Sequence, residues 1–273
     1  NTFGGAMREA AGALAAFGIA LSVKALVDWS AAASQLSSKM DQTNLILGSV
    51  AKGSKEASES QQFLRSTATE LMVPYEALIG TYGKFSAALV TSKFELKDAQ
   101  KIYKDLAGAG AALNLSQADL AAVFKAVEQM ASKGTVQLEE LKGQLGDRIP
   151  GAMQAMAKAA GVSQESLSKL LQEGKVGSNV LGKFAEELKN MFSGDMAARA
   201  NTFQAQWPRM LNALTFAQED FGRSLNTALI PGIKALATSM ESPAFRNFAS
   251  ALGTVIGSAL SGLASMLSTI TAG

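Results

Sequence analysis

The chain has 273 residues, no cysteine, no histidine and a formal net charge of +2. The missing cysteines exclude disulfides and thiolate chemistry, and the missing histidines remove the commonest general base and transition-metal ligand. Most charged residues lie between Asp28 and Gly222, and no basic run resembles a nucleic-acid-binding patch. Abundant alanine and leucine with sparse β-branched residues favour helices over strands.

The first predicted element is a helix over residues 6–27 that is apolar nearly all round, so we expect it to be buried or to face lipid. An amphipathic pattern follows from Trp29 to Leu47, and Lys52–Ser60 is a polar segment with a helix start. Because the chain begins with Asn1 and shows no signal-peptide pattern, we expect it to be an excerpt from a longer polypeptide.

Three helix starts share one design, in which an apolar residue precedes the capping position and another follows it four residues later. They are Val73–Leu78, Leu115–Leu120 and Val162–Leu167. Ser116 and Ser163 are predicted N-caps, and Pro74 takes the same position in the first copy. The starts lie 42 and 47 residues apart, which indicates stacked helical hairpins, although the sequences between them match poorly.

Other local signals concern helix ends and carboxylates. A capping box at Ser92–Glu95 predicts a helix that runs to about Ala112. Adjacent carboxylates at Glu139–Glu140 and Glu186–Glu187 point in different directions on a helix, so we expect them on solvated faces. Five glycines are expected near helix C-termini: Gly108, Gly110, Gly134, Gly161 and Gly174.

The most distinctive stretch is Leu141–Val176, in which a GQLGDRIPGA core is followed by a GVS helix start and a Leu–Leu–x–x–Gly–x–Val end. It resembles the tape measure domain of tailed-phage and prophage tail proteins, and the resemblance extends from about Trp29 to Phe203. Its signature residues are Gly143, Gly146, Asp147, Arg148, Pro150 and Gly151.

Two interpretations of the Asp147–Arg148 pair remain open. In the first, Arg148 grips an anion or a partner protein. In the second, Asp147 caps the helix that starts at Ile149, and Arg148 bridges to a neighbouring helix. A Ser168–Lys169 pair has no oxyanion loop around it, so we do not expect a hydrolase dyad.

The resemblance implies a structural protein with no catalytic residues in this region. We also expect no cofactor and no metal site, because no carboxylates are spaced as in a calcium-binding loop. Proteins of this family are long helical chains that fill the tail tube during assembly and set its length. The implied partners are tail tube and tail tip or baseplate proteins, other copies of the chain around the tail axis, and the host membrane. The implied location is the lumen or tip of the virion tail after assembly in the host cytoplasm, with the host inner membrane as a destination after ejection.

Sequence-specific nucleic-acid binding is not expected. The span Val162–Leu188 superficially resembles a helix-turn-helix, but Lys183 and Lys189 are offset there by Glu186 and Glu187. A pore-forming or membrane-active toxin-type protein is the alternative function, and the charge-poor ends of the chain are its only support.

The C-terminal region is predicted to be helical, interrupted at Pro208 and Pro231, with a last helix starting at Ser242–Pro243. Its last 27 residues, 247–273, carry no charge and place an apolar stripe beside a stripe of small residues. We expect a partner or oligomer interface there, formed by Leu252, Gly253, Ile256, Gly257, Leu260, Ser261, Leu263 and Leu267. Burial in the core of the same chain and membrane insertion are the alternatives.

Together these patterns predict an all-α protein, a multi-helix bundle of stacked helical hairpins with long apolar terminal helices. We divide it into an apolar N-terminal helix over residues 1–28, a tape-measure-like helical domain over residues 29–205, and a C-terminal region over residues 206–273. That last region would contain kinked helices and end in the uncharged apolar helix.

Overall fold

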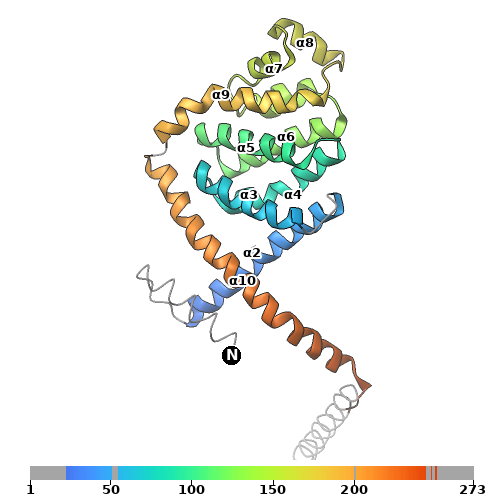
Figure 1. Ribbon diagram of the computed structural model, residues 1–273, viewed down its shortest axis with the longest axis vertical. Coiled ribbons are helices and arrows are strands. Elements are labelled where there is room, and N and C mark those ends of the chain that lie inside the picture. The colour runs from blue at the N-terminus through green and yellow to red at the C-terminus, as the bar shows by residue number, and fades with distance from the viewer. Residues whose placement is uncertain (1–22, 51–54, 200, 244–246, 248–249, 251–273) are drawn as a thin grey trace, which may run out of the picture. The chain divides into compact units, whose positions relative to one another are not determined.

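The computed structural model describes residues 23–50, 55–199, 201–243, 247 and 250 (Figure 1). Helices dominate this part of the chain, and its isolated β-bridge pairs Thr135 with Gly177. The predicted all-α class is therefore confirmed. Most residues of the two predicted terminal apolar helices lie outside the described part of the chain. Among the described helices, none is both long enough and apolar enough to cross a bilayer.

Four consecutive helices have the same length of 17 residues: α3 (Lys55–Leu71), α4 (Tyr75–Thr91), α5 (Leu96–Ala112) and α6 (Gln117–Lys133). The starts of α4, α5 and α6 follow one another at intervals of 21 residues. This interval is half the spacing between the first two of the three similar helix starts, because α5, which was predicted to begin at Ser92–Glu95, starts midway between them.

The turns after α3, α4 and α5 share one backbone pattern. Met72, Lys93 and Asn114 occupy the left-handed region, with φ of 53°, 71° and 54°. In each turn the next residue is apolar and donates its backbone N–H to a carbonyl in the last helical turn. The residue after that is the N-cap of the following helix. Three residues after α3, and four after α4 and α5, thus suffice to end one helix and begin the next.

The predicted serine caps are confirmed at two helices. Ser116 Oγ accepts the backbone N–H of Asp119 in α6 at 3.1 Å, and Ser163 Oγ accepts that of Ser166 in α8 (Gln164–Gln172) at 3.2 Å. The predicted capping box at Ser92–Glu95 is wrong. Ser92 instead ends α4 and donates its hydroxyl to the carbonyl of Ala131 at 2.8 Å.

Three of the five glycines end helices as predicted, namely Gly134, Gly161 and Gly174, each with a positive φ. Gly108 and Gly110 do not, since both are buried inside α5. A Cβ on Gly110 would lie 2.8 Å from Cδ1 of Leu120 and 3.4 Å from Cδ1 of Leu115. Gly110 therefore makes room for the apolar pair that brackets the start of α6.

The remaining elements are α2 (Val23–Val50), the π-helix η1 (Glu139–Leu145), α7 (Ala152–Ala160), α8, the 3₁₀ turn η2 (Ser178–Val180), α9 (Leu181–Arg199) and α10 (Phe203–Glu241), which includes both Pro208 and Pro231. Helix α4 packs against α2 and α6, and α5 packs against α9. Tyr103 lies at the centre of an aromatic core, stacked on Phe124 at 4.1 Å and edge-on to Phe85 at 5.2 Å.

The chain divides into two compact units, residues 10–222 and residues 1–9 with 223–273. The described part of the first unit, residues 23–222, is called the body below. It contains helices α2 to α9 and the first 20 residues of α10.

Candidate functional site

The predicted interface from Leu252 to Leu267 lies outside the described residues. The signature residues, by contrast, lie in the body: Gly143 is inside η1, and the others lie in the turn between η1 and α7. A second site that the sequence did not predict lies where the first half of α10 meets α3 and α4.

The signature turn begins with a π-helix, a wide helix type that is frequent at functional sites. At its end, the backbone N–H of Gly146 donates to the carbonyl of Leu141 at 2.9 Å. A Cβ on Gly146 would overlap the carbonyl oxygen of Lys142. The wide turn can therefore close only on glycine, whereas Gly143 has no described atom within 4 Å of a Cβ position.

Gly151 joins the signature turn to two helices. It is the N-cap of α7 with φ of 82°, a conformation that favours glycine. A Cβ there would lie 2.9 Å from Sδ of Met191 on α9. Ile149 is fully buried two residues earlier, while Pro150 is exposed. The buried side chain of Ile149 therefore anchors the turn in the core, and the missing side chain of Gly151 leaves room for Met191 of α9.

Arg148 bridges to the start of α6, as the second interpretation predicted. Its Nε donates to Asp119 Oδ1 at 3.1 Å, and its Nη1 donates to the carbonyl of Gln144 at 2.8 Å. Asp119 also accepts the hydroxyl of Ser116 at 2.6 Å, so one carboxylate joins the N-cap of α6 to the signature turn. The predicted cap by Asp147 is wrong, because α7 starts at Ala152, five residues after Asp147, and its N-cap Gly151 makes no side-chain hydrogen bond.

The second site centres on Asn212 of α10, which supplies the cap that Pro74 cannot provide to α4. Asn212 Oδ1 accepts the backbone N–H of Tyr75 at 2.9 Å. Its Nδ2 donates to the carbonyl of Val73 at 2.7 Å. The side chain is 3% exposed, so these bonds are shielded from water. A residue 137 positions away in the sequence therefore completes the turn between α3 and α4.

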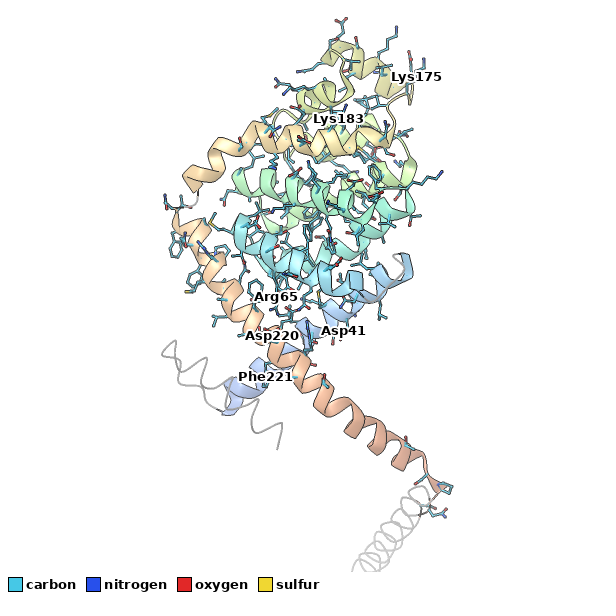
Figure 2. The ribbon with its side chains drawn as sticks, in the orientation of Figure 1. Asp41, Arg65, Lys175, Lys183, Asp220 and Phe221 are labelled. Carbon is cyan, nitrogen blue, oxygen red and sulfur yellow. The ribbon has the colours of Figure 1, made fainter. Side chains whose placement is uncertain are left out.

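Glu219 lies two turns further along the same face of α10 and is fully buried. Its carboxylate accepts Arg65 Nη2 at 2.7 Å, Gln61 Nε2 at 2.9 Å and the hydroxyl of Tyr75 at 3.0 Å. Arg65 Nη2 also donates to the neighbouring Asp220 at 2.6 Å, and both residues are labelled in Figure 2. A buried carboxylate needs such partners to remain charged away from water. We use the name α10 seat for Asn212 and Glu219 of α10 together with their partners Gln61, Arg65 and Tyr75.

The α10 seat also contains aromatic contacts, and its burial and charges shift the pKa values of Tyr75 and Arg65. The ring of Phe216 lies edge-on to Tyr75 at 4.9 Å and beneath the guanidinium of Arg65 at 5.0 Å. Burial raises the pKa of the Tyr75 phenol above its ordinary value, and the Glu219 carboxylate raises it further. Burial alone would lower the pKa of Arg65, but its hydrogen bonds to Asp220 and Glu219 outweigh that effect and raise it.

Backbone contact closes the far end of the α10 seat. A Cβ on Gly222 would overlap the carbonyl oxygen of Ala33 in α2. Phe221, beside it, is buried. Side-chain hydrogen bonds and a close approach of two helices thus fix the first half of α10 to the body.

The sequence carried one signal for the α10 seat that went unused. Asn212, Phe216 and Glu219 follow one another at steps of four and three, which places them on one helix face. A polar residue at each end of an otherwise core-like stripe indicates buried hydrogen bonding. Their partners, Arg65 and Tyr75, could not be inferred, because they lie more than 140 residues away from Glu219.

The adjacent carboxylates form no catalytic pair. Glu186 and Glu187 lie on α9 and pair with Lys101 and Lys158. The expectation that Glu140 is solvated is wrong, since it is 3% exposed within η1, where it pairs with Lys133. The described part of the chain contains no cluster of three or more acidic residues placed to hold a metal ion.

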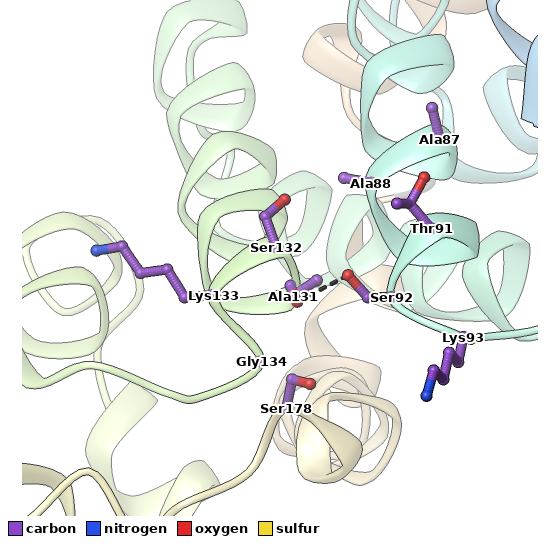
Figure 3. A pocket seen from close by; sticks show the side chains of 10 residues that line it. All are labelled: Ala87, Ala88, Thr91, Ser92, Lys93, Ala131, Ser132, Lys133, Gly134 and Ser178. Atoms are coloured by element: carbon purple, nitrogen blue, oxygen red, sulfur yellow. Dashed lines mark hydrogen bonds between the residues drawn. The ribbon is translucent and has the colours of Figure 1, made fainter.

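A groove of about 480 Å³ lies between the ends of α4 and α6 (Figure 3). Alanine side chains line it, and two lysines, Lys93 and Lys133, lie near its edge. Two of its polar groups have partners: Ser92 donates its hydroxyl to the carbonyl of Ala131, and Lys133 pairs with Glu140. The lining contains no carboxylate that could serve as a general base.

Comparison with known proteins identifies the family. The family model described as tape measure protein matches residues 31–223. A protein named probable tape measure protein, from Salmonella phage Felix O1 (isolate Felix O1-VT1), is 31% identical over 236 residues, which is 82% of this chain. The chain therefore belongs to the tape measure protein family, a family of structural phage tail proteins. It spans 30% of that relative's length, and no solved structure matches it significantly.

Proposed function

We propose that this chain is a folded, non-catalytic segment of a tape measure protein that takes part in setting tail length during assembly. We place it in the lumen or at the tip of the tail tube. The observation that carries the proposal is the family match over residues 31–223, which covers nearly the whole body. The body adds no arrangement of groups that would support catalysis in its described residues.

Within that role, the body acts as an anchor rather than as the ruler itself. A ruler needs a length proportional to residue number, and an extended helix supplies roughly 1.5 Å per residue. Helices α3 to α6 fold back on one another, so each span of roughly 25 Å uses 17 residues without extending the chain further. The measuring length would then come from other parts of the longer protein, since this chain spans 30% of its relative.

The proposed partners follow from this role. Tail tube and tail tip or baseplate proteins would hold the body, and other copies of the chain would meet around the tail axis. After leaving the tail, the protein would help the genome to pass through the host envelope. Sequence-specific DNA binding is no part of the proposal, because exposed cations such as Lys101 and Lys158 are paired with acidic residues of α9.

In-frame deletions in the parent phage gene test the proposal. Removing residues from an extended helical part outside this chain should shorten tails by roughly 1.5 Å per residue. Removing α5 and α6 together should instead abolish tails or leave them with variable lengths, because it destroys the core of an anchor. Electron microscopy of the particles provides the measurement, and tails uniformly shortened by the α5–α6 deletion would refute the anchoring role.

A further inference from the structure

The outward side of the first half of α10 carries an apolar stripe. Phe203 is 73% exposed, Trp207 46% and Met210 43%, and Leu214 continues the stripe half-buried. The rings of Phe203 and Trp207 stack at 5.7 Å. Isolated exposed apolar residues are ordinary on protein surfaces, but a continuous aromatic and methionine stripe marks an interaction site. We call these four residues the α10 stripe.

The stripe and the α10 seat occupy opposite sides of the same helix. Stripe residues follow one another at steps of four, three and four, the apolar repeat of a left-handed coiled coil. Ala205, Asn212 and Glu219, seven residues apart, are all buried and lie half a turn round from the stripe. One side of α10 is therefore consumed by the body, and the other is available to a second helix without disturbing Asn212 or Glu219.

We propose that the α10 stripe is the surface through which two copies of this chain associate, with α10 packed against α10. This inference deepens the assembly role proposed above, because it names the surface through which copies would meet, and it rests on that role.

Charge favours a second copy as the occupant. The positions that flank a coiled-coil stripe usually carry charges that select the partner. Between Phe203 and Leu214 they carry Gln204, Gln206, Leu211 and Ala213, none of which is charged. A stripe with uncharged flanks meets its own copy without like-charge repulsion, and the same patch on both copies satisfies the symmetry of a two-fold interface. The one charged residue between Phe203 and Leu214, Arg209, lies outside these flanking positions, so a strongly charged partner would find little along the stripe to pair with.

The stripe also has a defined end. Five turns after Phe203, the helix reaches Phe221, which is buried, and Gly222, which lies against the backbone of Ala33. The proposed contact is therefore short, and large side chains must supply most of its affinity. Trp207 is the expected anchor, since tryptophan is the residue type most enriched among energetically dominant interface positions.

The test compares three full-length chains by sedimentation velocity between about 1 and 200 μM, a range in which a weak specific dimer is measurable. The wild-type chain should associate with rising concentration. The double variant Trp207→Glu, Met210→Glu should raise the dissociation constant at least tenfold, because it places like charges in the seam. The control, Leu45→Glu, makes the same change at a leucine of α2 that is 74% exposed, and it should associate like the wild type.

Circular dichroism melts check that each variant is folded, and the exposed location of the substitutions should leave the melts unchanged. A monomeric wild-type chain over the whole range would overturn the inference. A double variant that associates as the wild type does would also overturn it, because self-association would then have to use another surface, such as the charge-poor ends of the chain. Both results leave the deletion experiment on tail length unaffected, so the failure of this inference and of the anchoring role can be told apart.

Discussion

Asn212 is the most informative single residue to perturb, because it holds α10 on the body and also caps α4. Substitution by alanine removes the acceptor for the N–H of Tyr75 and the donor for the carbonyl of Val73. Loss of a helix cap costs about 1 kcal/mol. A buried carbonyl left without a partner adds about 1–3 kcal/mol. The expected loss in the free energy of unfolding of Asn212→Ala is therefore about 2–4 kcal/mol.

Asn212→Asp separates the two contributions. Aspartate is as good an N-cap as asparagine, so a purely capping role predicts little change. In the structure, however, Nδ2 lies 2.7 Å from the carbonyl oxygen of Val73. An aspartate would place a carboxylate oxygen there, acceptor against acceptor, in a site shielded from water. Asn212→Asp is therefore expected to destabilise the body at least as much as Asn212→Ala.

Urea denaturation of the full chain, followed by circular dichroism, provides the measurement, with Ser116→Ala as the matched control. Ser116 caps α6 at an exposed site, so its loss should cost only about 1 kcal/mol. If the slope of the unfolding free energy against urea concentration is the same in the variants and the wild type, the same cooperative unit unfolds in each. If Asn212→Ala cost no more than Ser116→Ala, or if Asn212→Asp were neutral, the bridging role of Asn212 would be refuted.

Three further outcomes are expected in the same assay. Leu167→Ala should cost about 2–5 kcal/mol because the side chain is fully buried at the start of α8, and a loss below about 1 kcal/mol would contradict this. Lys93→Gly should stabilise the chain by up to about 1 kcal/mol, since φ at Lys93 is 71° and glycine adopts it without strain; a lower midpoint would argue against that turn. The raised pKa of Tyr75 contributes stability below its ordinary pKa and loses it as pH rises beyond, so Tyr75→Phe should reduce the decline by about 1.4 kcal/mol per pH unit above about pH 10. The buried Tyr103, whose pKa is also raised, is present in both the wild type and the variant and contributes equally to both. If stability fell equally steeply with pH in the two proteins, the role of Tyr75 would be refuted.

Local signals predicted local structure well. Ser116 and Ser163 cap helices, and Gly134, Gly161 and Gly174 end them, because each acts through hydrogen bonds or dihedral angles within a few residues. The errors share a physical cause. Gly110 resembles a helix end and Ser92 a helix start in isolation, but their roles depend on Leu120 and Ala131 of a neighbouring helix.

The signature turn shows an intermediate case. Its glycines and Arg148 were recognised from sequence, but their geometry was not, because a π-helix leaves no periodic trace distinct from an α-helix over seven residues. Asp147 was assigned a cap that the turn does not need, since Gly151 itself stands at the N-cap of α7. The structure gives Gly146, Arg148 and Gly151 a shared role of holding a tight connection between three helices.

The α10 seat was beyond prediction for a different reason. Glu219 is stable as a buried carboxylate only where Gln61, Arg65 and Tyr75 converge, and no single segment contains that information. The seat also explains why α10 bears an apolar stripe on its outward side. A helix whose inner side is occupied by a polar network cannot rotate to bury Phe203 and Trp207 without separating Glu219 from Arg65. The same bonds that fix α10 to the body therefore keep the stripe facing outward, which is what an assembly surface requires.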